Sequence, residues 1–316
     1  MPRSRLKRLW REFRYLIGPA ALEASVALTR IIPLPFTLLL MEDLLGRIAW
    51  PLAGPYRGQM RENLRLSLGE IPEEERDRIA KEALRNMFRG FVELLYSVHS
   101  FERLSPHLRW RGEEHLKETL AQGRGVIAVT AHLGNFTLMG VAMARRGYPF
   151  RMIIKDPKHP RMARTFQKMR KQQGTPWIPA VPPMKCQREI LRALKRGEVV
   201  CFVADENRRR GGIVMEFLGR KMAMPPGPAF YHMATGAPIL PVFLLRGQRG
   251  LEMVIKPPLE VSLSGDRDRD LYLITKTVTQ EIEGMIRRHP EQWHWVSRTR
   301  VKIRTRRRAL EEIDKS

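Results

Sequence analysis

"VIAVTAHLGNFTLMG", residues 126–140, joins an apolar run to a histidine and then to an amphipathic segment. The run predicts a buried strand, and the spacing after it predicts a helix from Asn135 to Arg146. Similar units follow: "PFRMIIK" before a helix from Pro160 to Gln173, "TPWIPA" before a helix from Met184 to Lys195, and the strand "EVVCFVAD". This alternation predicts an α/β fold with a central, mostly parallel or mixed sheet flanked by helices.

The remaining segments extend this pattern. Residues 71–98 begin with Pro and acidic residues and continue with apolar residues at three- and four-residue spacing, which predicts a helix. Residues 108–125 predict a short strand, a turn and a helix. Residues 236–246 and 251–261 predict a pair of strands, and a final amphipathic helix is expected from Leu271 to Arg288.

Two chemically active side chains fall at predicted strand ends. In open α/β sheets, ligands bind beyond the carboxyl ends of the strands. His132 and Asp205 both lie at such ends. Histidine, with an ordinary pKa near ~6.5, is the usual candidate for a general base. A lone histidine is more often structural, so its role depends on the residues around it.

Four blocks occur in order along the chain: "AHLGNF", "DEN", "EFLGRKMAMPPGPAFYHMATGAPILPVF" and "HPEQWHWVSR". Together they resemble the bacterial lipid A biosynthesis acyltransferases, within the lysophospholipid acyltransferase superfamily, over roughly residues 56–303. The resemblance implies a membrane-associated enzyme at the cytoplasmic face of the inner membrane. Such an enzyme moves a fatty acyl chain from acyl carrier protein or acyl-coenzyme A to a hydroxyl of a glycolipid, such as a lipid A precursor, without a cofactor or a metal.

The resemblance also implies roles for single residues. His132 matches the catalytic histidine, and Asp205 matches the aspartate of an Asp-Gln pair in which Glu206 replaces glutamine. The other matching positions, expected to bind substrate or shape the site, are Gly134, Asn135, Arg170, Phe217, Gly219, Gly227, Gln292, Trp293 and Trp295.

Position 137 departs from the family pattern, which places an acidic residue there; this chain has Thr137. Threonine can hydrogen-bond an imidazole but brings no charge to stabilise its cation. Three interpretations are open. Asp205 or Glu206 supplies the missing charge, His132 works with Thr137 alone on a slower reaction, or the site has decayed and the protein binds lipid without catalysis.

Two cations join the list of substrate-binding candidates. Lys155 ends the second predicted strand, where it would meet an acceptor phosphate, and Arg208 begins a run of three arginines suited to a phosphate headgroup. Both have a simpler interpretation as solvated surface residues. In the same way, Asp205 and Glu206 are expected to cap a turn and pair with these arginines if they have no catalytic role.

The charge balance points to an anionic partner. Lys and Arg number 57 and Asp and Glu number 33, a net charge of +24. Nucleic acid is disfavoured because no recognition helix, zinc module or RNA-stacking motif is present. Anionic lipid and an acidic carrier protein remain. The eight histidines lack metal-ligand spacing, and Cys186 and Cys201 are a poor disulfide framework.

We expect three parts of the chain. Residues 1–55 comprise a basic arm and apolar helices without an uninterrupted span of about 20 apolar residues, which predicts a segment lying on a membrane. A covering for the main domain's core and a tilted or re-entrant span are the alternatives. Residues 56–303 form the acyltransferase-like domain, and 304–316 a basic and polar tail. Trp293 and Trp295 lie beside basic residues and are expected to suit a lipid headgroup layer.

Overall fold

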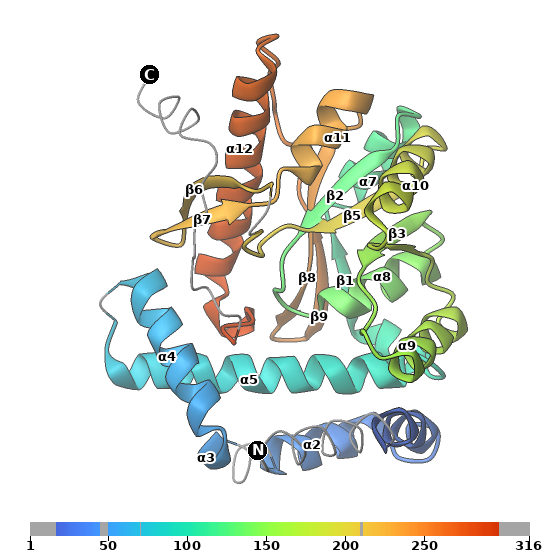
Figure 1. Cartoon of the computed structure of the whole chain (residues 1–316). Coiled ribbons are helices and arrows are strands. Elements are labelled where there is room, and N and C mark those ends of the chain that lie inside the picture. Colours follow the sequence, from blue (N-terminus) through green and yellow to red (C-terminus); the bar gives the residue numbers. More distant parts are fainter. Residues whose placement is uncertain (1–16, 45–49, 70, 209–210, 297–316) are drawn as a thin grey trace, which may run out of the picture.

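A seven-stranded mixed sheet forms the centre of the molecule (Figure 1). The computed structural model describes residues 17–44, 50–69, 71–208 and 211–296. Across the sheet the strands follow the order β1-β9-β8-β2-β5-β3-β4. Their bounds are β1 (Leu108–Arg111), β2 (Val126–Thr130), β3 (Phe150–Ile154), β4 (Trp177–Pro179), β5 (Val199–Val203), β8 (Ile239–Gly247) and β9 (Gly250–Ile255).

The strand pairings confirm the predicted sheet type. Among the described strands of this sheet, all neighbours are parallel except β8 and β9, the expected pair of strands, which are antiparallel. All five residues of β2 are buried. A strand covered on both faces is rich in apolar residues along its whole length, which explains the run Val126–Val129 that precedes Thr130.

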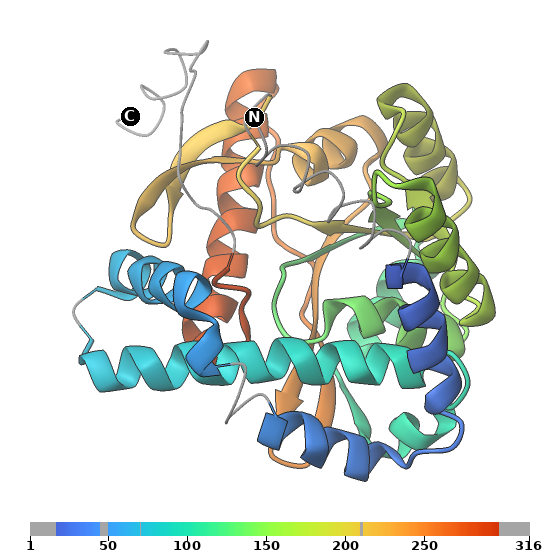
Figure 2. The same ribbon diagram turned by 60° about the horizontal axis from the view of Figure 1, so that its bottom comes forward.

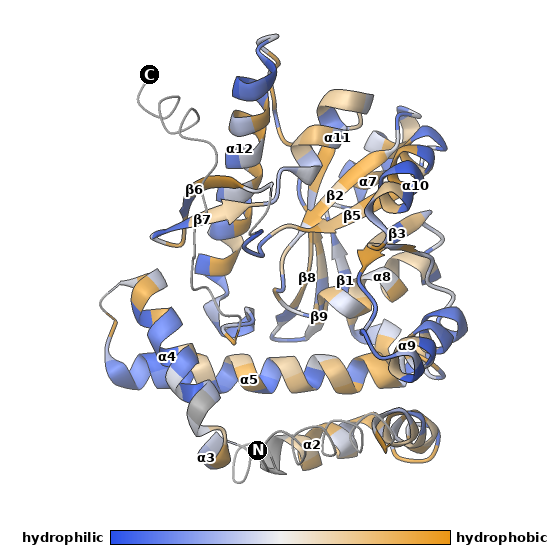
Figure 3. Ribbon diagram, viewed as in Figure 1, coloured by the Kyte–Doolittle hydropathy of each residue, from blue (hydrophilic) through white to orange (hydrophobic). Residues whose placement is uncertain are grey.

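Helices cover both faces of this sheet. They are α5 (Glu73–Tyr96), α6 (Phe101–Leu104), α7 (Glu113–Ala121), α8 (Phe136–Arg145), α9 (Pro160–Gln172), α10 (Pro183–Lys195), α11 (Gly227–Thr235) and α12 (Arg267–Arg288), with 3-10 turns η2 (Ser105–His107) and η3 (Pro290–Gln292). Successive residues of β2 point to opposite faces. Ile127 and Val129 pack in one cluster with α10, α11 and α12, whereas Val126 and Ala128 pack in another with α7 and α8. Figure 3 shows the apolar strands enclosed by helices whose outer surfaces are hydrophilic.

The N-terminal residues form helices that lie against α5 (Figure 2). These are residues 17–28, α2 (Leu34–Leu44), α3 (Trp50–Leu52) and α4 (Gly54–Leu68). Leu22 and Val26 pack against Leu95 and Met169, so this segment covers part of the main domain. Its outer surface exposes Leu28, Ile31, Phe36, Leu39, Leu40 and Leu52. No described helix is long and apolar enough to span a bilayer. Attachment to a membrane stays a prediction, and the basic arm and the C-terminal tail lie outside the described residues.

A small hairpin, β6 (Ile213–Phe217) with β7 (Arg220–Met224), was not predicted from the sequence. Phe217 pairs with Arg220, so Leu218 and Gly219 form a two-residue turn. Both have positive φ, 51° and 69°, as a type I′ turn requires. A leucine rarely adopts such an angle, and here its N–H donates to Glu283 of α12. The missing Asn-Gly signal explains why the pattern did not reveal this hairpin.

Candidate active site

Strand register brings His132 and Asp205 together. Thr130 at the end of β2 lies opposite Val203 at the end of β5. Two residues beyond this pair, β2 is followed by His132 and β5 is followed by Asp205. The two side chains, 73 positions apart in the sequence, therefore meet beyond the carboxyl ends of neighbouring parallel strands.

The Asp205 carboxylate binds the His132 ring. Its Oδ1 lies 2.8 Å from Nδ1 of the imidazole, and its Oδ2 accepts the main-chain N–H of His132 at 2.8 Å. A third donor, the indole N–H of Trp293, reaches Oδ2 at 2.7 Å. Asp205 is only 4% exposed, so these bonds replace hydration around a buried charge. An acceptor at Nδ1 places the ring proton there and leaves Nε2 with a free lone pair.

The pair shifts both pKa values in opposite directions. Burial disfavours the imidazolium, but the Asp205 carboxylate and, more weakly, Glu206 outweigh it and raise the pKa of His132 above 6.5. Burial likewise opposes the charged form of Asp205, yet the charge and hydrogen bonds of His132, with the bond from Trp293, lower the pKa of that carboxyl. The carboxylate thus stays charged and stabilises a protonated ring.

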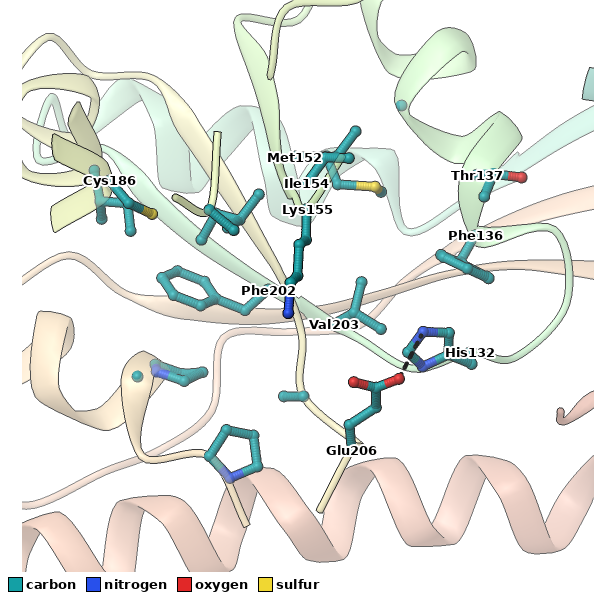
Figure 4. A pocket seen from close by; sticks show the side chains of 18 of the residues that line it. His132, Phe136, Thr137, Met152, Ile154, Lys155, Cys186, Phe202, Val203 and Glu206 are labelled. Carbon is teal, nitrogen blue, oxygen red and sulfur yellow. Dashed lines mark ion pairs between the residues drawn. The ribbon is translucent and has the colours of Figure 1, made fainter. Parts of the chain in front are cut away.

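The other ring nitrogen of His132 lies toward Glu206, whose Oε1 is 3.7 Å from Nε2 (Figure 4). Glu206 is largely exposed, with 69% of its side chain accessible. Phe136 contacts the imidazole edge-on, with 4.8 Å between ring centroids. His294 lies 5.9 Å away, and burial together with the charge of His132 lowers its pKa to about 4, so this second imidazole stays neutral.

Thr137 makes no hydrogen bond to the His132 ring, contrary to one interpretation of the sequence. Its hydroxyl donates to the side-chain oxygen of Asn135 at 3.1 Å. The amide of Asn135 in turn donates to Glu93, a buried carboxylate that also binds Arg246. The hydroxyl of Thr137 therefore joins a polar network that is separate from the contact between His132 and Asp205. Of the three interpretations, this geometry matches the one in which Asp205 supplies the charge.

Gly134 and Asn135 shape the turn that carries His132. Gly134 has φ of 61°, and a Cβ there would lie 2.1 Å from the carbonyl oxygen of Leu244. Asn135 caps α8 by accepting the N–H of Leu138. Both are absent from the cavity lining. Their contacts therefore fix the turn that carries His132.

A cavity of about 930 Å³ opens beside the histidine. Predicted site residues that line it are His132, Thr137, Lys155, Arg170, Glu206, Arg208 and Gly227. Apolar side chains form much of the remaining wall, among them Val141, Met152, Phe166, Ile190 and Phe202. In Figure 4, Cys186 of α10 lies at the opposite end of the labelled group from His132, with Lys155 between them. The cavity is suited to a long apolar ligand with a charged or polar head.

Two of the predicted residues, Arg170 and Phe217, have clear structural partners. Arg170 forms an ion pair with Asp156 through one guanidinium nitrogen and stacks on Trp177, 4.5 Å from its ring centroid. Phe217 and Gly219 do not line the cavity: Phe217 is buried against Trp293, and Gly219 lies at the hairpin turn. The assignment of these two residues to substrate binding therefore lacks structural support.

The expected headgroup role of the two tryptophans is wrong. Trp293 is 3% exposed and Trp295 is fully buried, with their rings 4.6 Å apart. Trp295 donates its indole N–H to the carbonyl of Pro290. The aromatic residues precede a basic tail in sequence, but they point into the domain. Their spacing therefore reflects packing inside the domain. The neighbouring basic residues suggested a lipid headgroup contact for Trp293, but its indole N–H contacts Asp205 instead.

Residues around Trp293 tie the C-terminal segment to the catalytic turn. Gly134 donates its N–H to the carbonyl of Gln292, and His294 donates to the carbonyl of His132. The Gln292 side chain binds both the N–H and the carbonyl of Arg246. Nothing in the sequence indicated that His294 lies beside His132, because the two are 162 residues apart.

Both cysteines are buried free thiols, and Cys186 borders the cavity. Among the described residues, no cluster of three or more His, Cys, Asp or Glu side chains could hold a metal ion. The titratable side chains that line the cavity include His132, Glu206, Lys155 and Arg208. Asp205 is buried beside His132 and does not line the cavity itself.

Comparison with known proteins agrees with this geometry. A family model described as "Bacterial lipid A biosynthesis acyltransferase" matches residues 8–301. A phosphatidylinositol mannoside acyltransferase of Mycolicibacterium smegmatis is 27% identical over 238 residues, covering 75% of this chain and 77% of its own. A lipid A biosynthesis palmitoleoyltransferase of Escherichia coli is 26% identical over 277 residues, covering 84% and 86%. A lipid A biosynthesis myristoyltransferase of the same species is 22% identical over 257 residues, covering 80% and 77%.

Proposed function

The chain belongs to the bacterial lipid A biosynthesis acyltransferase family, and from this membership we propose that it transfers a fatty acyl chain from a thioester donor to a hydroxyl of a glycolipid. It is an acyltransferase, as the relatives named above are. The observation that carries the finer proposal is the contact between His132 and Asp205 beside a large, mostly apolar cavity.

His132 acts as the general base. The acceptor hydroxyl approaches Nε2, which takes its proton as the oxygen attacks the thioester carbonyl. The tetrahedral intermediate then collapses, the carbon–sulfur bond breaks, and the imidazolium returns the proton to the leaving thiolate. Asp205 keeps the other ring proton at Nδ1 and stabilises the transient cation, as the buried aspartate does in other histidine-based acyl transfer sites.

Asp205 also supports activity over the alternative of an inactive lipid-binding relative. That alternative rests on the loss of the acidic residue at position 137. A carboxylate nevertheless contacts Nδ1 at 2.8 Å, from the neighbouring strand. The imidazole therefore has the charge partner that Thr137 does not provide.

The acceptor is a glycolipid, because the relatives act on lipid A or phosphatidylinositol mannoside by name. Lys155 and Arg208 line the cavity and are both exposed, where they can bind a phosphate of the acceptor or donor. The acyl chain lies along the apolar wall, where its burial stabilises the complex by about 0.8 kcal/mol per methylene.

The reaction takes place at the cytoplasmic face of the inner membrane. Six apolar side chains exposed on the N-terminal segment, from Leu28 to Leu52, support binding to a bilayer surface. In Figure 1 the helix α2 of this segment lies well away from α10. The enzyme can therefore bind the membrane with one surface and receive its donor at another.

Acyl carrier protein is the proposed donor in preference to acyl-coenzyme A. Met184, Arg188, Leu191 and Lys195 recur at helical spacing on the outer side of α10, and all four are exposed. The inner side of the same helix lines the cavity with Cys186 and Ile190. A face combining cations with two apolar side chains suits an acidic carrier, which would deliver its thioester next to the cavity.

The test is acyl transfer by the full-length protein on glycolipid-containing vesicles, with acyl carrier protein and coenzyme A thioesters supplied separately. Product is measured by mass spectrometry. His132→Ala should abolish transfer, whereas His107→Ala, a matched change of an exposed histidine, should not. Transfer that survives His132→Ala would refute the assignment of the base. Failure of every donor and acceptor pair would favour the inactive alternative.

A further inference from the structure

Main-chain and ring contacts hold Trp293 beside the active site. It follows η3, and its main chain forms a single-residue antiparallel bridge with Leu133, the residue after His132. The indole is 3% exposed and packs edge-on against Trp295, with 4.6 Å between ring centroids, and against Phe217 at 6.2 Å. The ring therefore has little freedom to turn its N–H away from Asp205.

The two oxygens of the Asp205 carboxylate have different partners, and the indole N–H of Trp293 is one of them. Oδ2 accepts both Trp293 Nε1 at 2.7 Å and the His132 main-chain N–H at 2.8 Å. With two donors on Oδ2, the plane of the carboxylate is set, and Oδ1 is left to bind His132 Nδ1 alone. Asp205 is buried, so water is poorly placed to replace a lost donor.

We propose that Trp293 is a positioning residue of the active site, whose indole N–H fixes the Asp205 carboxylate in the orientation that binds and polarises the His132 ring. This rests on the proposed function, in which His132 is the base. Trp293 does not line the cavity, so it acts through Asp205 without touching substrate.

Removal of the indole N–H should have two effects. The carboxylate loses one of three donors and can rotate, which weakens the control of the ring tautomer and lowers kcat by about ten- to hundredfold. As long as Oδ1 stays within hydrogen-bond distance of Nδ1, the negative charge of the carboxylate is less neutralised by donors, so it favours the imidazolium more and raises the pKa of His132. The acid limb of the pH–rate profile should then move to higher pH, while KM stays near the wild-type value.

The decisive comparison is Trp293→Phe against Trp295→Phe in the full-length protein. Both changes replace a buried indole in the same segment, but Trp295 donates to the carbonyl of Pro290 and not to Asp205. Only Trp293→Phe should lower kcat and shift the acid limb. The His132 ring is followed independently by NMR titration of nitrogen-labelled protein, which needs no turnover.

Each outcome decides the question. Equal effects of the two substitutions on kcat and on the His132 titration would overturn the proposal. If Trp293→Phe does not fold, site-specific replacement of Trp293 by 3-benzothienylalanine keeps the ring shape and removes only the N–H, and an unchanged titration in that protein would also overturn it. An inactive wild-type protein whose His132 titration still responds to loss of the Trp293 donor would refute the proposed function while supporting the contact.

Discussion

Asp205→Asn is the change that separates the structural account of the site from its alternatives. The carboxylate accepts two N–H groups on Oδ2 and the His132 ring on Oδ1. Asparagine has a single oxygen and a donating NH₂ group. If its oxygen keeps the two N–H donors, the NH₂ faces Nδ1. The proton then moves to Nε2, and the ring can no longer act as a base there.

The opposite orientation of the asparagine is no better, because its NH₂ would face the N–H groups of Trp293 and His132. Loss of the charge also removes the main stabilisation of the imidazolium. Tautomer reversal in comparable sites lowers kcat by about 10⁴-fold, so we expect a loss of about 10³- to 10⁴-fold, or roughly 4–5 kcal/mol of transition-state stabilisation. The pKa of His132 should fall, opposite to the shift expected for Trp293→Phe.

The assay is steady-state acyl transfer at several pH values, with thermal unfolding measured in parallel. Asp270→Asn is a matched control, because Asp270 is also buried and also accepts three hydrogen bonds, from Ser264 and Gly265. That variant should keep its kcat. An Asp205→Asn enzyme that retains more than a tenth of the wild-type rate would show that the carboxylate is not the partner of His132.

Four further outcomes are expected. Thr137→Glu should not raise turnover and should lower Tm, because it brings a second carboxylate near the buried Glu93 of α5. A clear gain in turnover would contradict the proposal that Asp205 supplies the charge for His132. Gly134→Ala should lower the free energy of unfolding by more than about 1 kcal/mol. The loss should exceed that of Gly197→Ala, because an added Cβ meets a carbonyl oxygen at 2.1 Å at position 134 and meets nothing within 4 Å at position 197. Denaturant titration measures both losses. The acid limb of kcat/KM should have its midpoint above 6.5, because Asp205 raises the pKa of His132 and a protonated ring is no base; a midpoint below 6.5 would disagree. Cys186→Phe should shift donor preference to shorter acyl chains, measured by competition between thioesters of different length.

Much of the fold was predictable because each strand and helix carries its own periodicity. The largely apolar β2, the apolar β5 and the amphipathic α5, α9 and α10 lie within a few residues of their expected bounds. The start of α12 was placed four residues late, since Asp266 caps it by accepting the N–H groups of Asp268 and Arg269. The β6–β7 hairpin was missed because its turn uses leucine and glycine, without the usual asparagine.

The site was predictable only in part. The local pattern alone places His132 and Asp205 at strand ends. Because their strands are neighbours, the two side chains meet, as the interpretation in which Asp205 supplies the charge requires. The destination of Thr137 was not predictable, because its hydroxyl meets Asn135 only in the geometry of the α8 turn. The tryptophans were misassigned for a similar reason: an indole beside basic residues in sequence can point outward or inward, and packing decides which.

The sequence by itself determined most of the strands and helices and the positions of His132 and Asp205 at strand ends, since backbone preference and apolar periodicity are properties of short segments. Only the tertiary structure decided that β2 lies beside β5, that the Asp205 carboxylate lies 2.8 Å from Nδ1 of His132, and that Trp293 reaches this carboxylate from the other end of the chain. These contacts depend on which elements pack together across the whole domain, a choice set by the summed burial of many side chains and not by any one stretch of residues.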